Sequence, residues 1–232
     1  MAYGSLVGTT IVILGAGKMG RAIAAAAAGA RIVFLGRGEA TLESARAALP
    51  GVDLRTIVAD ATDEADVAKA FEAIGPVDHI VAATSSGTAG VAPPEATIPR
   101  VNLADAHAVY RRLWAAYNAL HVGARVLRPG GSVTLISGAS ARRPTAGFGI
   151  YGALHAAIEG LARAAAVELA PLRVNVVSPG SIGVNPMRQL THHHGRFDDL
   201  ADAVLSVIRN PAVTSAVFDV DGGESLGTWS GE

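Results

Sequence analysis

Several features that would point to particular protein classes are missing from this chain of 232 residues. It contains no cysteine, which excludes disulfide bonds, thiolate catalysis and cysteine-ligated zinc. Its 19 lysines and arginines nearly balance its 20 aspartates and glutamates, so no basic field attracts nucleic acid or an anionic membrane. No apolar run approaches the ~18 residues of a membrane span, and Met1–Ser5 carry no basic signal-peptide segment. We expect a cytoplasmic protein that binds neither nucleic acid nor membranes.

What the chain does contain is a regular alternation of strand-like and helix-like segments. With 50% hydrophobic and 17% charged residues, it has the composition of a folded domain rather than a disordered one. The alternation predicts an α/β fold: one doubly wound Rossmann-type domain over residues 1–232, with a parallel seven-stranded sheet and helices on both faces. The predicted strands are Ile11–Leu14, Arg31–Leu35, Leu54–Val58, His79–Ala83, Ser132–Ile136, Val174–Val177 and Ala216–Val220. The predicted helices are Arg21–Ala28, Glu39–Leu49, Glu64–Ile74, Leu103–Leu127 and Ile150–Ala170, with a loop and only short helices after residue 177.

The first of these strands runs directly into a glycine-punctuated turn and then an alanine-rich helix. Gly15, Gly17 and Gly20 have the spacing Gly-x-Gly-x-x-Gly between strand and helix that is typical of dinucleotide binding. The first glycine permits the tight turn, the second lets a pyrophosphate approach the backbone, and the third lets helix and strand pack closely. The helix N-terminus offers free N–H groups to the phosphates. We therefore expect a dinucleotide site here.

The residue at the end of the second strand indicates which dinucleotide binds. An NAD site usually has an acidic residue about 20 positions after the glycine motif, and this chain has Arg37 there. A guanidinium binds a 2′-phosphate in a bidentate manner, whereas a carboxylate repels it, and Lys18 in the turn adds a second cation. These residues favour NADP(H), with a solvated loop charge as the alternative for Arg37. Asp60, after the third strand, is a candidate for the adenine edge or a plain turn residue.

The long helix predicted at 103–127 has two neighbouring faces whose residues are of the kinds usually buried. One apolar stripe contains Val109, Leu113, Ala116, Leu120 and Leu127, and a second row beside it contains Tyr110, Trp114, Tyr117 and His121. A helix on a sheet needs only one such face. We favour a subunit interface for the aromatic row, because exposed aromatic rows mark contacts; packing on another helix of the same chain is the alternative. Trp229 is a further candidate for a subunit contact.

Two late segments carry a family resemblance. Residues 159–180, EGLARAAAVELAPLRVNVVSPG, look like the helix–strand–Pro-Gly block of the short-chain dehydrogenase/reductase family, and residues 217–223, VFDVDGG, look like its C-terminal turn. The chain resembles this family over nearly its whole length. The resemblance implies a nicotinamide cofactor near Pro179 and Gly180, with Met19, Ala83 and Ile182 also in the cofactor site. It also implies a homodimer or homotetramer built through the two long helices.

The chain departs from the family pattern at the positions that carry the chemistry. The glycine turn is one residue shorter than usual, and Ala82-Ala83-Thr84-Ser85 replaces the Asn-Asn-Ala-Gly turn. The tyrosine of the family's Tyr-x-x-x-Lys pair is present as Tyr151, but His155 stands where the family has lysine. Arg112 aligns with the family's asparagine, and Asn118 is too close to the fifth strand to replace it. The expected serine position is Gly138; Ser137 is one residue away, and Ser140 is a weaker candidate.

The resemblance nevertheless implies roles for the residues that remain. Ser137 would bind a substrate carbonyl, Tyr151 would donate the proton, and His155 would touch the nicotinamide ribose and tune Tyr151. A histidine of pKa near 6.5 is mostly neutral at pH 7, so it lowers the tyrosine pKa less than a lysine, which favours tyrosine as an acid. We expect reduction of a small carbonyl substrate with NADPH. The alternatives are a non-redox lyase, isomerase or cyclase on the same fold, and a catalytically silent nucleotide-binding homologue; Tyr151 and His155 are then purely structural.

Two further groups of residues lie near the expected substrate entrance. His192, His193 and His194 follow the Pro-Gly turn, where a polar lid is the favoured interpretation and substrate contact the alternative. Consecutive histidines do not converge on one metal ion, so we expect no metal site. Arg142 and Arg143 precede Tyr151 and are either a solvated pair or an attraction for an acidic substrate.

Overall fold

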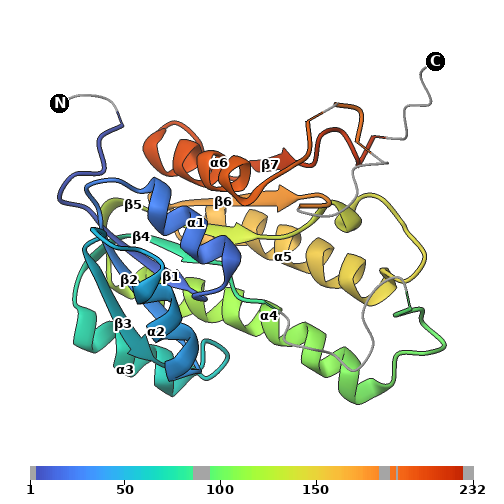
Figure 1. The fold of residues 1–232 in the computed structure, drawn as a ribbon, viewed down its shortest axis with the longest axis horizontal. Coiled ribbons are helices and arrows are strands. Elements are labelled where there is room, and N and C mark those ends of the chain that lie inside the picture. Colours follow the sequence, from blue (N-terminus) through green and yellow to red (C-terminus); the bar gives the residue numbers. More distant parts are fainter. Residues whose placement is uncertain (1–3, 86–94, 183–188, 192, 227–232) are drawn as a thin grey trace.

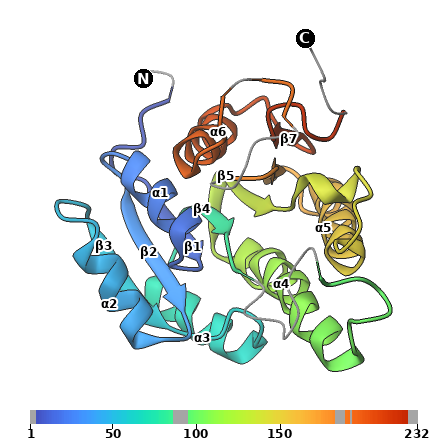
Figure 2. The same cartoon turned by 45° about the vertical axis from the view of Figure 1, so that its right-hand side comes forward.

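Seven parallel strands pair side by side in the order β3-β2-β1-β4-β5-β6-β7, as the computed structural model shows (Figures 1 and 2). The structure describes residues 4–85, 95–182, 189–191 and 193–226. The strands are β1 (Thr10–Leu14), β2 (Arg31–Gly36), β3 (Leu54–Val58), β4 (Val77–Ala82), β5 (Leu127–Ile136), β6 (Arg173–Pro179) and β7 (Val217–Val220). The predicted α/β class and the seven-stranded parallel sheet are thus confirmed.

The helices cover both faces of this sheet (Figure 1). On one face lie α1 (Lys18–Ala26), α2 (Glu39–Ala47) and α6 (Phe197–Arg209). On the other lie α3 (Glu64–Ile74), α4 (Leu103–His121) and α5 (Gly149–Glu168). Short 3₁₀ turns, η1 (Gly123–Arg125) and η2 (Ala139–Ala141), flank β5. The sheet is therefore the middle layer of three.

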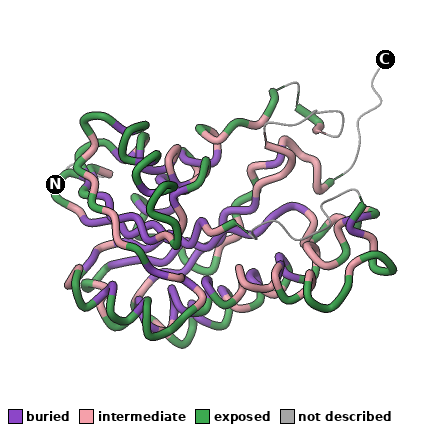
Figure 3. The backbone as a smooth tube through the Cα atoms, turned by 60° about the horizontal axis from the view of Figure 1, so that its bottom comes forward, coloured by how far each residue is buried: buried purple, intermediate pink, exposed green. Residues whose placement is uncertain are grey.

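Alternate strand residues divide the core into two halves. Val12 and Leu14 pack under α3, α4 and α5, whereas Ile11 and Ile13 pack under α1, α2 and α6. All four are fully buried, because a strand covered on both faces has no solvent side. Figure 3 shows the buried strands in the middle and exposed backbone concentrated on the outer helices and turns.

Two of the predicted helices need correction. The long helix ends at His121, not Leu127, and Leu127 is the first residue of β5. The chain turns through η1 because Gly123 passes so close to β4 that a Cβ there would collide with the Ile80 side chain. In addition, the segment after β6 contains the 13-residue helix α6 rather than only short helices. Its buried face includes Leu200, Val204 and Ile208.

The strand order reverses between β1 and β4, which lie next to each other although β2 and β3 separate them in the chain. The connections leave these two strands in opposite directions, so a crevice opens at their carboxyl ends, where ligands bind in open α/β sheets. The glycine turn after β1 lies at this point. None of the helices that the structure describes has the length and apolar character needed to cross a membrane.

Candidate functional site

The three motif glycines are required for two different reasons. Gly15 has φ of +112°, and a Cβ there would lie 2.6 Å from the Ala83 carbonyl oxygen. A Cβ on Gly20 would collide with the carbonyl oxygen of Gly15. Gly17, in contrast, would meet no protein atom within 4 Å. The chain's own packing thus explains Gly15 and Gly20, whereas the open space above Gly17 is what an approaching pyrophosphate needs.

Helix α1 begins directly after this open space. Its N-cap is Gly17, with no side-chain cap and no acidic residue in the first turn. The first N–H groups of a helix have no partner within the helix and carry a partial positive charge. The start of α1 is therefore suited to an anionic group above Gly17.

A cleft of about 730 Å³ extends from this turn over the carboxyl ends of β2, β3 and β4. Seven of the predicted cofactor residues line it, namely Gly15, Gly17, Lys18, Met19, Arg37, Asp60 and Ala83. Gly20 is buried beneath the turn. Pro179, Gly180 and Ile182 lie at or just after the end of β6 and do not line this cleft. Their role toward the nicotinamide stays a prediction.

The charge in the cleft is mainly positive. Lys18 and Arg37 are exposed and have no ion pair with another residue that the structure describes. The carboxylate of Asp60 accepts hydrogen bonds from the Thr62 amide and hydroxyl and pairs with Arg111 on α4. Burial alone would raise the pKa of Asp60, but these hydrogen bonds and the Arg111 charge outweigh it and lower the pKa. Asp60 is thus neutralised by Arg111, while two cations face the cleft without a partner.

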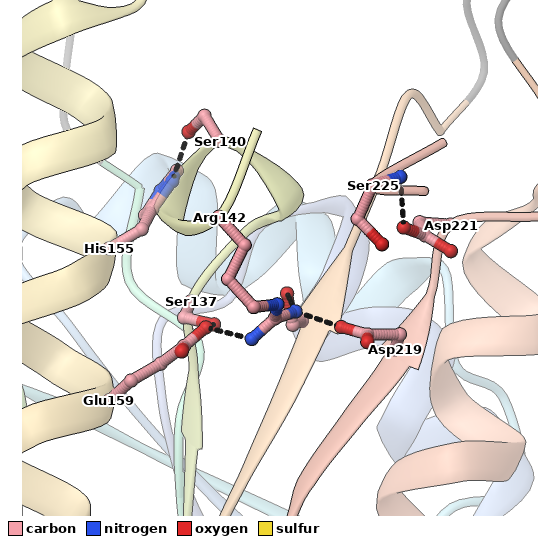
Figure 4. A network of polar contacts seen from close by, with 9 residues as sticks. Ser137, Ser140, Arg142, His155, Glu159, Asp219, Asp221 and Ser225 are labelled. Atoms are coloured by element: carbon pink, nitrogen blue, oxygen red, sulfur yellow. Dashed lines mark hydrogen bonds and ion pairs between the residues drawn. The ribbon is translucent and has the colours of Figure 1, made fainter. Parts of the chain in front are cut away.

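A second cluster forms around the imidazole of His155, on α5. Its Nε2 lies 3.0 Å from Nη1 of Arg112, which comes from α4, and its Nδ1 lies 2.8 Å from Oγ of Ser140 in η2. Figure 4 shows the Ser140 contact. The ring lies against Gly138, where a Cβ would be 2.6 Å from the imidazole Cε1. Both ring nitrogens are engaged, so neither is left for a ribose hydroxyl; the predicted ribose contact of His155 has no support in this geometry.

The electrostatics of this cluster depend on burial. Burial and the nearby Arg112 charge lower the pKa of His155 to about 3, and burial lowers that of Arg112 to about 10. At neutral pH the imidazole is therefore neutral and the guanidinium charged. Tyr151 is one helical turn before His155; burial raises its pKa, Arg112 acts in the opposite direction, and the net shift is upward. Tyr151 thus keeps its proton at neutral pH, as an acid requires.

Ser137 belongs to a different network, deeper in the sheet. Its hydroxyl is 2% exposed and donates to Oε1 of Glu159 at 3.1 Å. Arg142 donates to the same carboxylate oxygen at 2.7 Å, to the Ser178 hydroxyl at 3.1 Å and to Asp219 (Figure 4). Arg142 is therefore held by two carboxylates rather than being a free surface charge. The predicted role of Ser137 in carbonyl binding stays a prediction, but its hydroxyl already has a buried partner.

The remaining predicted residues are more scattered. His193 lies 2.7 Å from Asp199, and His194 is exposed, while His192 and Trp229 lie outside the described residues. Within the part of the chain that the structure describes, no three His, Asp or Glu side chains come together as a metal ion requires. The sequence analysis missed Arg111 and the contact of Arg112 with His155. The signal available was a pair of adjacent arginines in the middle of the helix, next to its apolar and aromatic stripes.

One family model and several relatives match nearly the whole chain. A family model described as enoyl-(acyl carrier protein) reductase matches residues 17–225. Carbonyl reductase family member 4 from Danio rerio is 30% identical, over 93% of this chain and 97% of its own length. L-xylulose reductase from Bos taurus is 31% identical, over 94% of this chain and 97% of its own.

Solved structures of dehydrogenases have the same fold. A short-chain type dehydrogenase/reductase from Mycobacterium ulcerans matches with a TM-score of 0.87 and 25% identity, covering 97% of this chain and 92% of its own. A small-chain dehydrogenase in complex with NADPH matches with a TM-score of 0.75 and 29% identity, covering 94% of this chain and 99% of its own.

Acidification tests the buried state of His155. Because its folded pKa of about 3 lies below the unfolded value of 6.5, the unfolded chain binds more protons between these values and stability falls as the pH falls. From pH 7.5 to pH 5 we expect a loss of about 2 kcal/mol in unfolding free energy from this group. Chemical denaturation of His155→Gln should show a fall smaller by about that amount. His79, whose burial lowers its pKa to about 4, accounts for part of the fall that remains; equal falls in both proteins would contradict the assignment.

The close contact between Gly138 and His155 leads to a second prediction, on the stability of variants at these two positions. Gly138→Ala should cost about 1–3 kcal/mol because the new methyl group meets the imidazole. In a His155→Ala background the same change should cost less than about 1 kcal/mol, giving a clear coupling in a double-mutant cycle. Gly160→Ala is the matched control, since Gly160 on α5 has open space around its Cα and alanine should be neutral or stabilising there. Additive effects of Gly138→Ala and His155→Ala would refute the contact.

Proposed function

Because the chain belongs to the short-chain dehydrogenase/reductase family, we propose that it is an NADP(H)-dependent oxidoreductase that reduces a small carbonyl compound. The observation that carries the proposal is the pair of cations, Lys18 and Arg37, which form no ion pair within the described residues and lie beside the open space above Gly17. A dinucleotide whose pyrophosphate lies on the start of α1 brings its adenosine ribose toward the end of β2, where Arg37 lies. Its 2′-phosphate would then meet a cation that pairs with no carboxylate in the part of the chain that the structure describes.

Two further observations support the cofactor and the direction. One structural neighbour is in complex with NADPH, and one relative is named as a carbonyl reductase. In this chain the upward-shifted pKa of Tyr151 suits a residue that gives a proton to a reduced carbonyl oxygen rather than one that removes a proton from an alcohol. When bound, the cofactor would supply the hydride. The residues of the chain bind it, orient the substrate and deliver the proton.

Cofactor preference can be tested at Arg37. Loss of charge-assisted hydrogen bonds to a 2′-phosphate costs roughly 1.5–3 kcal/mol, or on the order of ten- to a hundredfold in affinity. Arg37→Glu should therefore weaken NADPH binding by at least this factor in a fluorescence titration and leave NADH binding unchanged or stronger. Arg46→Glu, on α2 and outside the cleft, is the matched control and should bind both cofactors as the wild type does.

Two outcomes would overturn the proposal in different ways. Equal wild-type affinities for NADPH and NADH would remove the NADP(H) preference. Binding of NADPH without reduction of any carbonyl compound would favour the alternatives, a non-redox enzyme or a nucleotide-binding protein on the same fold.

We also infer that the protein forms homodimers or homotetramers through α4 and α5. The two helices lie side by side (Figure 2). Trp114 and Tyr117 on α4 are 54% and 44% exposed, and Val167 on α5 is 79% exposed. The Tyr117 ring stacks on His121, with ring centroids 5.4 Å apart. Such an exposed aromatic and apolar row is typical of a subunit contact.

Light scattering with size-exclusion chromatography tests this interface. Trp114→Glu combined with Val167→Glu should lower the assembly mass to that of a smaller oligomer or monomer, because two charges would be buried without partners. Val58→Glu is the matched control: Val58 is equally exposed, at 54%, but lies on β3 at the other edge of the sheet, and should leave the mass unchanged. A monomeric wild type would refute the interface.

A further inference from the structure

Three side chains from three separate elements form one hydrogen-bonded chain, Arg112–His155–Ser140. Arg112 comes from the middle of α4, His155 from the second turn of α5, and Ser140 from η2 after β5. The two contacts, of 3.0 Å and 2.8 Å, use opposite nitrogens of the imidazole. Arg112 is itself fixed by a second hydrogen bond, from Nη2 to the Ile136 carbonyl oxygen at 3.3 Å. The chain therefore starts from an anchored group at the end of the sheet.

The chemistry of the guanidinium determines which atom donates and which accepts in each of the two hydrogen bonds of His155. Arginine has five N–H donors and no acceptor, so Nε2 of His155 accepts its hydrogen bond. An imidazolium has no acceptor nitrogen, and a neutral imidazole with an accepting Nε2 carries its proton on Nδ1. Nδ1 of His155 therefore donates to Oγ of Ser140. The hydroxyl hydrogen of Ser140 then points away from the imidazole.

The backbone of Ser140 lies beside the first turn of α5, which carries Tyr151. The backbone carbonyl oxygen of Ser140 lies against the first turn of α5, where a Cβ on Gly152 would be 2.8 Å from it. Gly152 is next to Tyr151 in that turn. Ser140 is partly exposed, whereas Ser137 is 2% exposed and donates to Glu159. Figure 4 shows Ser140 with His155 apart from the Ser137–Glu159–Arg142 cluster. Among the described residues, the imidazole, which donates, is the only hydrogen-bond partner of the Ser140 hydroxyl.

We propose that Ser140 is a catalytic residue whose hydroxyl donates a hydrogen bond to the carbonyl oxygen of the substrate, and that His155 and Arg112 are positioning residues that hold it in this orientation. This assignment rests on the carbonyl reduction proposed above. It replaces Ser137, whose hydrogen is directed to a buried carboxylate. It also explains Gly138, because the imidazole occupies the space that a side chain at that position would need.

The reduction uses one hydride and one proton, and it needs no reactant besides the cofactor and solvent water. The bound dihydronicotinamide would supply a hydride, that is two electrons and one proton, to the carbonyl carbon. The π electron pair of the carbonyl moves to its oxygen, which takes the phenolic proton of Tyr151, and the product is an alcohol. Ser140 keeps its hydrogen throughout and stabilises the negative charge that develops on oxygen. Tyr151 then regains a proton from water.

The same geometry excludes the other chemistry that a serine–histidine pair suggests. A nucleophilic serine needs an adjacent base that takes its proton. Here Nδ1 of His155 already carries a hydrogen and Nε2 is bound to a cation, so the ring has no free acceptor for the Ser140 proton. Ser140 is a hydrogen-bond donor rather than a nucleophile.

Kinetics with NADPH and a set of ketones (diacetyl, ethyl acetoacetate and cyclohexanone) test the assignment. Ser140→Ala should lower kcat by about a hundredfold to a thousandfold, the typical effect of removing one donor to a developing oxyanion. Its NADPH affinity in a fluorescence titration should equal that of the wild type. His155→Ala should lower kcat by a smaller factor, and the double variant Ser140→Ala/His155→Ala should be no slower than Ser140→Ala alone. This non-additivity is expected for residues that act as one unit.

Ser132→Ala provides the matched control. Ser132 lies within β5, and its Oγ also contacts an imidazole Nδ1, that of His79, at 2.9 Å, in a fully buried position. Removing this second serine–histidine contact should leave kcat within about twofold. The proposal is overturned if Ser140→Ala is as fast as the wild type, or if Ser137→Ala and not Ser140→Ala removes the activity. A wild-type protein that binds NADPH but reduces none of the ketones overturns the proposed function, and the role of Ser140 with it.

The protonation of the His155 ring nitrogens can be measured by NMR, and this measurement does not depend on activity. In ¹⁵N-labelled protein at pH 7, assigned with His155→Gln, the His155 ring should show a protonated Nδ1 and a bare Nε2. Arg112→Met should change this pattern, because the donor to Nε2 is gone. A protonated Nε2 or an imidazolium in the wild type would refute the orientation of Ser140 even if Ser140→Ala were inactive.

Discussion

The carboxyl ends of all seven strands point to one edge of the sheet, and this constraint determines where chemistry can occur. The strand order reverses between β1 and β4, so the chain leaves the two central strands in opposite directions and does not fill the space above them. The glycine turn, Arg37, Asp60 and the segment from Ser137 to Ser140 follow the ends of four different strands. They share an edge because the strands are parallel, although they are far apart in the sequence.

A single partly buried cation, Arg112, organises the part of that edge that we propose to be catalytic. Arg112 lies where the resemblance to the family expects an asparagine, and a donor-only group beside an imidazole dictates that the imidazole is neutral. It also supplies the permanent positive charge near Tyr151 that the histidine cannot supply. Arg112, Gly138 and His155 thus fit one another: the guanidinium fixes the imidazole ring, and the ring occupies the space that a side chain at position 138 would need.

The two halves of the site follow different physical rules. In the half proposed to bind the cofactor, exposed Lys18 and Arg37 face a cleft and pair with no carboxylate among residues 4–85, 95–182, 189–191 and 193–226, so they are available to an anion. In the half proposed to be catalytic, His155 and Glu159 are buried and hydrogen-bonded to polar neighbours. Buried polar groups of this kind are costly to leave unpaired, which makes their arrangement rigid and their proton positions definite.

Local patterns in the sequence were sufficient for the sheet, for the glycine turn and for the place of Arg37 at the cleft. Each depends on residues close together in the chain: a buried apolar run, a spacing of glycines, the residue that ends a strand. The same patterns misplaced the end of α4, where the close approach of Gly123 to Ile80 involves a neighbouring strand. They gave only short helices where the 13-residue α6 lies, although Leu200, Val204 and Ile208 have helical spacing.

The hydrogen-bond partners of His155 are 43 and 15 positions away, and no spacing rule connects them. Sequence comparison therefore pointed to a histidine near a cofactor ribose and a serine at 137. Only the tertiary structure decided that this ring is bound on both sides and that Ser137 faces a carboxylate, because which donor meets which acceptor is determined by the packing of α4 and α5 on β5.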